Sequence, residues 1–272
     1  RRAQMEKDRY AVLMTHQLKA PLDAIRSKIN LVKGEYCGEV SPEIREVISK
    51  IDHRASGMAS LILDVLKLER LKAAARDNNA REQISIEIVI RKCIDKLRPI
   101  ASSRHIDVKV SLQDFAVEGI PNQLEILLEN VISNAIAYSY DNTTVEIVAA
   151  VEGAGSYGTV TVIDHGIGIG EKDLPHIFDE YFYTPRAALH NRTSSGIGLS
   201  IVKTVAENNK LQIRISSEQN VGTTFSVIFP AITSVSIPET EVYSGVPSSH
   251  LVNSQSRPLD SEKDGNELAS TH

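Results

Sequence analysis

The first 70 residues repeat apolar side chains at a spacing that few folds accommodate. Residues 3–33 contain no glycine, and apolar or small residues recur there in alternating steps of four and three, at Ala11, Thr15, Leu18, Leu22, Ile25, Ile29 and Val32. The same alternation returns at Ile44, Ile48, Ile51, Ala55, Met58, Ile62 and Val65. Such spacing is typical of a heptad seam along one face of a long helix, so the sequence predicts two long helices.

A break at residues 34–42 separates the two seams. Ser41 is suited to cap a second helix that has Pro42 in its first turn, which predicts an antiparallel hairpin over residues 1–75. One hairpin leaves each seam half covered, so we expect two copies to pair as a homodimer in a four-helix bundle, burying apolar surface at about 25 cal/mol per Å². The alternative, in which the helices pack on the rest of the same chain, stays open.

The period of the apolar residues changes after a polar linker at residues 76–82. Residues 83–231 predict a second domain, an α+β two-layer sandwich in which a mixed sheet has helices on one face. Its expected helices lie at residues 89–102, 121–139 and 196–208, and its expected strands at 84–86, 106–110, 145–151, 159–163, 211–217 and 223–229. Residues 232–272 are dominated by Ser, Pro, Asn and acidic residues, with 6 acidic and 2 basic side chains and Tyr243 as the only aromatic one, which is typical of a disordered tail.

Composition disfavours several classes of protein. No apolar run approaches the roughly 20 residues of a membrane-spanning helix, and the formal net charge of -5 disfavours nonspecific nucleic-acid binding. Cys37 and Cys93 stand far apart without a metal-binding spacing, so we expect neither a disulfide framework nor a zinc site. The sequence begins Arg1-Arg2 without methionine, and we expect an upstream region to be missing from it.

Two segments of the second domain carry polar side chains suited to a nucleotide. Asn130 and Asn134 lie one turn apart on one face of a predicted helix, where their amide oxygens could serve a hard cation and its phosphates. Asp164 follows a predicted strand, so its carboxylate could accept a hydrogen bond from an exocyclic amine. Gly166 and Gly168 come directly afterwards, and glycines let the backbone approach a ligand closely.

Two further segments would complete such a site. Ser195, Gly196, Gly198 and Leu199 open a predicted helix, and free N–H groups at a helix start bind phosphate. Thr223 begins a strand, where its hydroxyl could assist the aspartate. Each segment alone is a weak signal, and no glycine loop of the GxxxxGK[ST] type occurs in the sequence.

Together and in this order, the four segments resemble the ATP-binding domain shared by gyrase, heat-shock chaperone, histidine kinase and mismatch-repair ATPases. The resemblance spans residues 83–230, and it implies ATP and Mg²⁺ as ligands, with Asn134 on the metal, Asp164 on the adenine amino group and the glycines of residues 196–198 beside the phosphates. The nucleotide contacts that it implies are Asn130, Asn134, Tyr138, Asp164, Gly166, Gly168, Ile169, Phe178, Ser195, Gly196, Gly198, Leu199 and Thr223.

Hydrolytic members of that superfamily carry a glutamate one turn before the metal-binding asparagine, and this sequence has Asn130 there. An amide is poorly equipped to deprotonate water, so the site is expected to hold ATP for another acceptor. His16 is suited to that role because it lies one residue past the seam position Thr15, which turns its ring outward. With a pKa near 6.5, an exposed imidazole is roughly three-quarters neutral at pH 7 and therefore nucleophilic.

Pro21 should kink the first helix just past His16, because proline cannot donate to the carbonyl four residues earlier. Residues 14–22 thus resemble the phosphoacceptor box of a two-component sensor histidine kinase, and residues 177–182 are similar to that family's aromatic box. The resemblance implies that His16, with Gln17 beside it, is autophosphorylated and passes the phosphoryl group to an aspartate of a separate response regulator. It also implies the cytoplasmic portion of a membrane-anchored sensor.

The sequence departs from that family at several positions. Gln17 stands where an acidic residue is usual, and Ala20 replaces the Thr or Asn of family phosphatases. Ala137 and Tyr183 replace a lysine and an arginine, so phosphate charge would be met by other cations, for which the candidates are Arg186, Arg192 and Lys203. These departures leave a second hypothesis open, a degenerate nucleotide-binding dimeric scaffold. A third, an ATP hydrolase of the same fold, is disfavoured by Asn130 and by the histidine box.

Overall fold

The computed structural model describes residue 21 and residues 23–36, 38–74, 81–191, 194–230 and 232–233. The predicted acceptor His16 and its neighbour Gln17 lie outside the described residues, as do Cys37, Arg192 and almost all of the predicted linker and tail.

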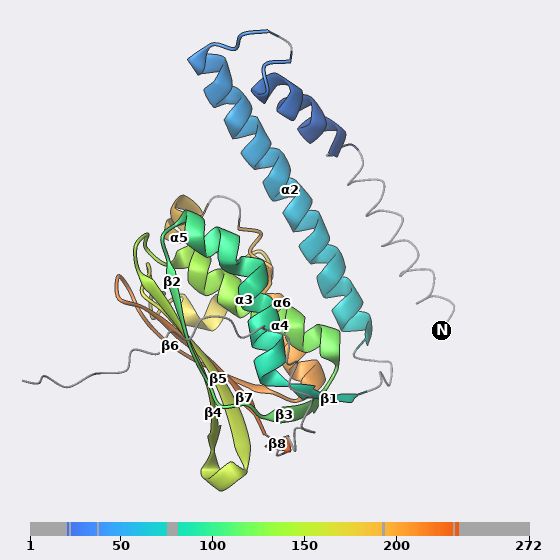
Figure 1. Ribbon diagram of the computed structural model, residues 1–272, viewed down its shortest axis with the longest axis vertical. Coiled ribbons are helices and arrows are strands. Elements are labelled where there is room, and N and C mark those ends of the chain that lie inside the picture. The colour runs from blue at the N-terminus through green and yellow to red at the C-terminus, as the bar shows by residue number, and fades with distance from the viewer. Residues whose placement is uncertain are drawn as a thin grey trace, which may run out of the picture. The chain divides into compact units, whose positions relative to one another are not determined.

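The described part of the first 75 residues is a helical hairpin. Residues 23–33 are helical, and after a turn the chain enters α2, Pro42–Ala74, which runs back alongside them (Figure 1). Ser41 caps α2 as predicted, because its hydroxyl accepts the backbone N–H of Ile44 at 3.4 Å. Ion pairs of Lys33 with Asp52 and of Glu35, in the turn, with Arg45 join α2 to the segment before it. Among the described residues, none of the helices has the length and apolar character to span a membrane.

Helix α2 has two different environments along its length. Near its start, large apolar side chains are exposed, at Ile44, Val47, Ile51 and Met58. Near its end, Leu68 and Leu71 are buried in a core shared with α6, Gly198–Asn209. The last part of α2 thus packs on the same chain, as the alternative for the seam had it, whereas the first part keeps an apolar face uncovered, and the homodimer stays a prediction.

The main sheet has five strands in the order β2-β4-β5-β7-β6. Its strands are β2 Asp107–Leu112, β4 Thr144–Glu152, β5 Tyr157–Asp164, β7 Gly222–Phe229 and β6 Gln212–Glu218. β2 pairs with β4 in parallel, and the other neighbours are antiparallel, so the expected mixed sheet is confirmed. The register places Asp164, the last residue of β5, opposite Thr223 near the start of β7.

Three helices cover one face of this sheet: α3 Ile86–Ser103, α4 Pro121–Tyr138 and α6 (Figure 1). Because side chains alternate along a strand, every second residue meets these helices, and Val160 and Val162 of β5 are buried there. Side chains with no exposed surface fill the layer between them, including Leu127, Leu128, Ile132, Ile147, Ile201 and Val227. The two-layer arrangement follows the expected sandwich.

A second, small sheet was not predicted. It consists of β1 Glu82–Ser85, β3 Ala116–Gly119 and β8 Ile232–Thr233, in the order β1-β3-β8. β8 pairs with β3, and its two residues follow directly after the predicted end of the domain at residue 231. Ile86 was expected in the first strand but is the first residue of α3, because the Ser85 side chain caps the helix there. The Ile86 side chain is fully buried. Short segments also form the 3-10 turns η1 Gly153–Gly155 and η2 Leu174–His176 and the helix α5 Pro185–His190.

Candidate functional site

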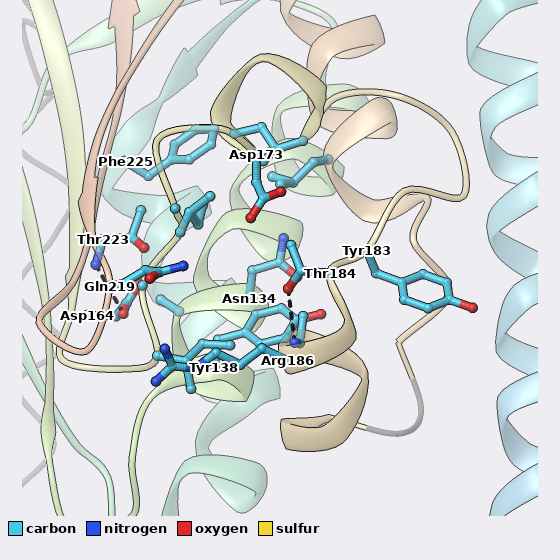
Figure 2. A pocket seen from close by; sticks show the side chains of 18 of the residues that line it. Asn134, Tyr138, Asp164, Asp173, Tyr183, Thr184, Arg186, Gln219, Thr223 and Phe225 are labelled. Atoms are coloured by element: carbon cyan, nitrogen blue, oxygen red, sulfur yellow. Dashed lines mark hydrogen bonds between the residues drawn. The ribbon is translucent and has the colours of Figure 1, made fainter.

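A cavity of about 360 Å³ lies between α4, the ends of β5 and β7 and the segment that contains α5 (Figure 2). We call residues 182–197 the lid; the structure describes residues 182–191 and 194–197 of it. Of the residues predicted to contact a nucleotide, seven line the cavity: Asn134, Tyr138, Asp164, Gly168, Ile169, Leu199 and Thr223. The fold thus places in one cavity predicted residues that lie up to 89 positions apart in the sequence, from Asn134 to Thr223.

Asp164 is buried at the end of β5, at one end of the cavity. Its Oδ1 accepts the backbone N–H of Thr223 at 3.2 Å (Figure 2). Burial raises the pKa of the Asp164 carboxyl to about 6, and the Thr223 N–H opposes that rise only in part. Because a carboxylate can accept a hydrogen bond from an amine, this end of the cavity is suited to a flat base with an exocyclic amino group.

The loop after Asp164 is wedged against the end of α4. Ser139 forms a bridge with Gly166, and the backbone N–H of Ile167 donates to the Tyr138 carbonyl at 3.1 Å. A Cβ atom on Gly166 would stand 2.0 Å from that carbonyl oxygen, so only glycine allows the approach. Gly166 itself does not line the cavity; it sets the position of the loop that carries Asp164.

Asn130 and Asn134 of α4 face the start of α6. A Cβ atom on Gly198 would stand 3.1 Å from Asn130 Oδ1 and 3.8 Å from Asn134 Nδ2, so both amides meet that helix start. Asn130 also donates its Nδ2 to the Ile126 carbonyl at 2.7 Å, which leaves Oδ1 directed at Gly198. Amide oxygens are ligands that a hard cation accepts, and the backbone N–H groups of a helix start suit phosphates.

These amides could hold Mg²⁺ only together with other oxygen ligands. In the described part of the chain, no cluster of three or more His, Cys, Asp or Glu side chains is arranged to hold a metal ion. Mg²⁺ commonly takes a few protein oxygens and completes its shell with water and substrate phosphates. The paired amides of Asn130 and Asn134 beside the start of α6 therefore fit a cation that arrives with a phosphate ligand.

Three other predicted contacts take different positions in this structure. Phe178 packs partly buried against the core, and Ser195 and Gly196 precede α6 outside the lining of the cavity. The Ser195 hydroxyl donates to Asp64 Oδ2 of α2 at 2.7 Å and accepts the Ile197 N–H at 3.3 Å. Burial raises the pKa of Asp64, and the hydrogen bond from Ser195 opposes the rise.

The lid closes one side of the cavity. Thr184 caps α5 by accepting the Ala187 N–H at 3.1 Å, and Arg186 extends along the cavity (Figure 2). Of the two described candidate cations for phosphate charge, Arg186 lines the cavity and Lys203 does not. The Arg186 guanidinium donates to the side chain of Asn220 on the β6–β7 turn, and the Arg186 side chain extends toward Asp164 (Figure 2). The guanidinium therefore lies at the same end of the cavity as Asp164, which we call the base end.

Sequence patterns missed several residues of the cavity, namely Asp173, Thr184, Gln219 and Phe225. Most of these lie in loops or in the lid, where no periodic spacing marks them. Phe225 belongs to a predicted strand, and its alternation with Val227 could have shown that it faces the helices.

Comparisons with known proteins show that the chain is similar to histidine kinases. Residues 119–233 match the family model described as histidine kinase-, DNA gyrase B- and HSP90-like ATPase. The chain is 29% identical over 233 residues to the sensor-like histidine kinase SenX3 of Mycobacterium tuberculosis, covering 85% of this chain and 56% of that protein. It is 28% identical over 216 residues to the signal transduction histidine-protein kinase ArlS of Staphylococcus aureus, covering 79% and 47%. The chain thus spans about half the length of these curated relatives.

A solved structure has a similar fold. The crystal structure of full-length ShkA in complex with AMPPNP matches with a TM-score of 0.61 at 20% identity, over 84% of this chain and 47% of that one. At this identity the likeness concerns the fold.

Proposed function

We propose that this chain, a relative of the sensor histidine kinases, is a kinase core that binds ATP and transfers its γ-phosphoryl group to His16. The observation that carries the proposal is one cavity lined by Asp164 and also by Asn134 and Leu199, the second residue of α6. A carboxylate suited to the amine of a base and a helix start suited to phosphates, both at one cavity, favour a nucleoside triphosphate over a smaller ligand.

At the base end, Asp164 would accept a hydrogen bond from the adenine amino group. Thr223 holds the carboxylate in place through its backbone N–H, and its hydroxyl lies 2.9 Å from the Ser217 hydroxyl. Apolar side chains such as Val131, Val162 and Phe225 line the cavity beside them and would exclude water from the faces of the base.

At the phosphate end, Asn130 and Asn134 would hold Mg²⁺ with the phosphates against the start of α6. A bound magnesium ion would neutralise charge on the transferring group. Neither asparagine can act as a base toward water, so the site favours transfer over hydrolysis. In the transfer, an imidazole nitrogen of His16 forms a bond to the γ-phosphorus as the bond to ADP breaks, and the ring gives up its proton to solvent.

The kinase core would act as a homodimer. Ile44, Val47, Ile51 and Met58 leave an apolar face of α2 uncovered, and a second hairpin of the same kind would cover it. The phosphohistidine would then serve an aspartate of a separate response regulator, and an upstream region would carry the membrane anchor of the sensor. Analytical ultracentrifugation tests the dimer: a monomer at micromolar concentration would contradict it.

Incubation with ATP labelled at the γ-phosphate tests the kinase. We expect label on the wild type that is stable in base and labile in acid, and no label on His16→Ala. His53→Ala is the matched control because His53 is an exposed histidine on α2, and this variant should be labelled normally. Label that persists in His16→Ala would contradict the acceptor, and nucleotide binding without any label would favour a scaffold.

A further inference from the structure

Helix α5 depends on contacts with the rest of the domain for its position. It has six residues, Pro185–His190, and an isolated helix of that length is not stable in water. Residues Thr184–Ala187 line the cavity, so whatever fixes α5 also shapes that wall.

His190, the last residue of α5, lies against the end of α4. Its ring stacks on Tyr138 with centroids 6.4 Å apart and meets the edge of Tyr140 at 5.9 Å. Its Nε2 stands 3.0 Å from the Ser139 carbonyl oxygen. A carbonyl oxygen can only accept, so Nε2 carries the proton and donates it. Four residues further along the lid, the Tyr138 hydroxyl donates to Ser194 at 2.7 Å.

Arg186 lies one turn before His190 on the same face of α5. Its guanidinium donates to the Tyr140 hydroxyl at 3.2 Å and to the Asn220 side chain. The side chain thus extends from the lid across the cavity wall to the β6–β7 turn, beside Gln219 and on the side of Asp164 (Figure 2).

We propose that His190 is a positioning residue for the nucleotide: by seating α5 on the end of α4, it places Arg186 across the base end of the cavity. The inference rests on the proposed function, which names the ligand as a nucleotide. It adds that a residue of the lid, His190, determines how tightly the nucleotide binds at the end of the cavity that holds Asp164. Of the residues that His190 contacts at the end of α4, Tyr138 also lines the cavity. Loss of those contacts frees Arg186 to leave the cavity even though its own side chain is intact.

A double-mutant cycle with ADP, measured by isothermal titration calorimetry on the full chain, tests this. ADP lacks the γ-phosphate, so the measurement reports binding without transfer. We expect His190→Ala and Arg186→Ala each to raise the Kd by about fivefold or more, and the double variant to bind no more weakly than Arg186→Ala alone, because contacting residues that act through one another are not additive. Additive losses in the double variant, or an unchanged Kd in His190→Ala, would overturn the proposal.

Control variants separate positioning from loss of fold. Leu189, the preceding residue of α5, is 75% exposed, and Leu189→Ala should leave the Kd for ADP unchanged. His190→Phe keeps an aromatic ring between the two tyrosines but lacks the N–H donor, and it serves as the second variant if His190→Ala does not fold. We expect its affinity for ADP to lie between that of wild type and that of Arg186→Ala. An equal Kd for His190→Phe and wild type would show that the hydrogen bond to Ser139 is dispensable and would overturn that part of the proposal.

Absence of ADP binding to the wild type would contradict the proposed function as well, whereas wild-type binding that is insensitive to His190 contradicts this inference alone.

Discussion

Asp164 and Thr223 face each other in the β5–β7 register, and the backbone N–H of Thr223 donates to the Asp164 carboxylate at 3.2 Å. The pairing fixes a carboxylate at the end of a buried strand, where little water reaches it. Desolvation outweighs the hydrogen bonds from the backbone N–H groups of Thr223 and Gly166, so the pKa of Asp164 rises to about 6. A group that titrates near neutral pH at the base end of the cavity makes both ligand affinity and stability depend on pH.

The affinity for ADP should fall as the pH drops below about 6, because protonated Asp164 is a weaker acceptor for the adenine amino group. Titration calorimetry between about pH 8 and pH 5 measures the change, with Asp164→Asn as the control, since an amide does not titrate in this range. We expect the variant to bind weakly and with little dependence on pH. A wild-type Kd that stays constant through pH 6 would contradict the assignment of Asp164.

The stability of the ligand-free protein should change in the opposite sense. The folded-state pKa of Asp164 is about 6, against an ordinary value of 3.8 for an exposed aspartate, so its protonated form favours folding. That stabilisation is complete below the unfolded-state pKa and is lost as the pH rises through about 6. Relative to wild type, Asp164→Asn should gain stability between about pH 4 and pH 8, by up to about 3 kcal/mol, since one pKa unit corresponds to about 1.4 kcal/mol. Urea unfolding at the two pH values measures the difference, and a constant difference would refute the linkage.

Two glycine substitutions should have opposite effects. Gly166→Ala places a Cβ atom 2.0 Å from the Tyr138 carbonyl oxygen, so α4 and the Asp164 loop must separate, and we expect a loss of about 2 kcal/mol or more together with weaker nucleotide binding. Gly57 lies within α2 with open space around its Cβ position, and Gly57→Ala should stabilise the helix by about 1 kcal/mol. Thermal unfolding of the two variants compares them. A stable Gly166→Ala variant with normal ADP affinity would show that the loop is not held as described.

The sequence predicted those parts of the fold that have regular spacing and recognisable ends. Pro121 and the apolar residues after it predicted a helix over 121–139, and α4 runs from Pro121 to Tyr138. The resemblance to sensor histidine kinases is confirmed by the comparisons. The strand β3 and the helix α5 have four and six residues, which is too short for a period to show. Ile86 was misplaced because the side-chain cap of Ser85 ended the strand before it, and a single apolar residue does not distinguish a strand from a helix start.

The candidate site was predictable where its residues sit on elements with a fixed register. Asn134 on α4, and Asp164 and Thr223 at facing ends of β5 and β7, meet because the helix face and strand pairing place them together. The position of Arg186 was not predictable, because it depends on contacts between α5 and residues 138–140 that leave no pattern in the sequence.

Arg104 offers a test of how the end of α4 is held. It lies just after α3, and its guanidinium donates to the carbonyls of Ile136, Ala137 and Ser139 at 2.7 to 2.9 Å, at a helix end whose last turn has no basic residue of its own. A charged donor that satisfies three carbonyls at the negative end of a helix contributes more than a surface ion pair, so Arg104→Ala should lose about 2–4 kcal/mol in urea unfolding. Arg98→Ala is the matched control, because Arg98 is an exposed residue of α3 that forms a surface ion pair with Asp95, and it should lose less than about 0.5 kcal/mol. Equal losses in the two variants would mean that the end of α4 is held by its backbone contacts with the Asp164 loop, and that Arg104 adds no more than a solvated charge.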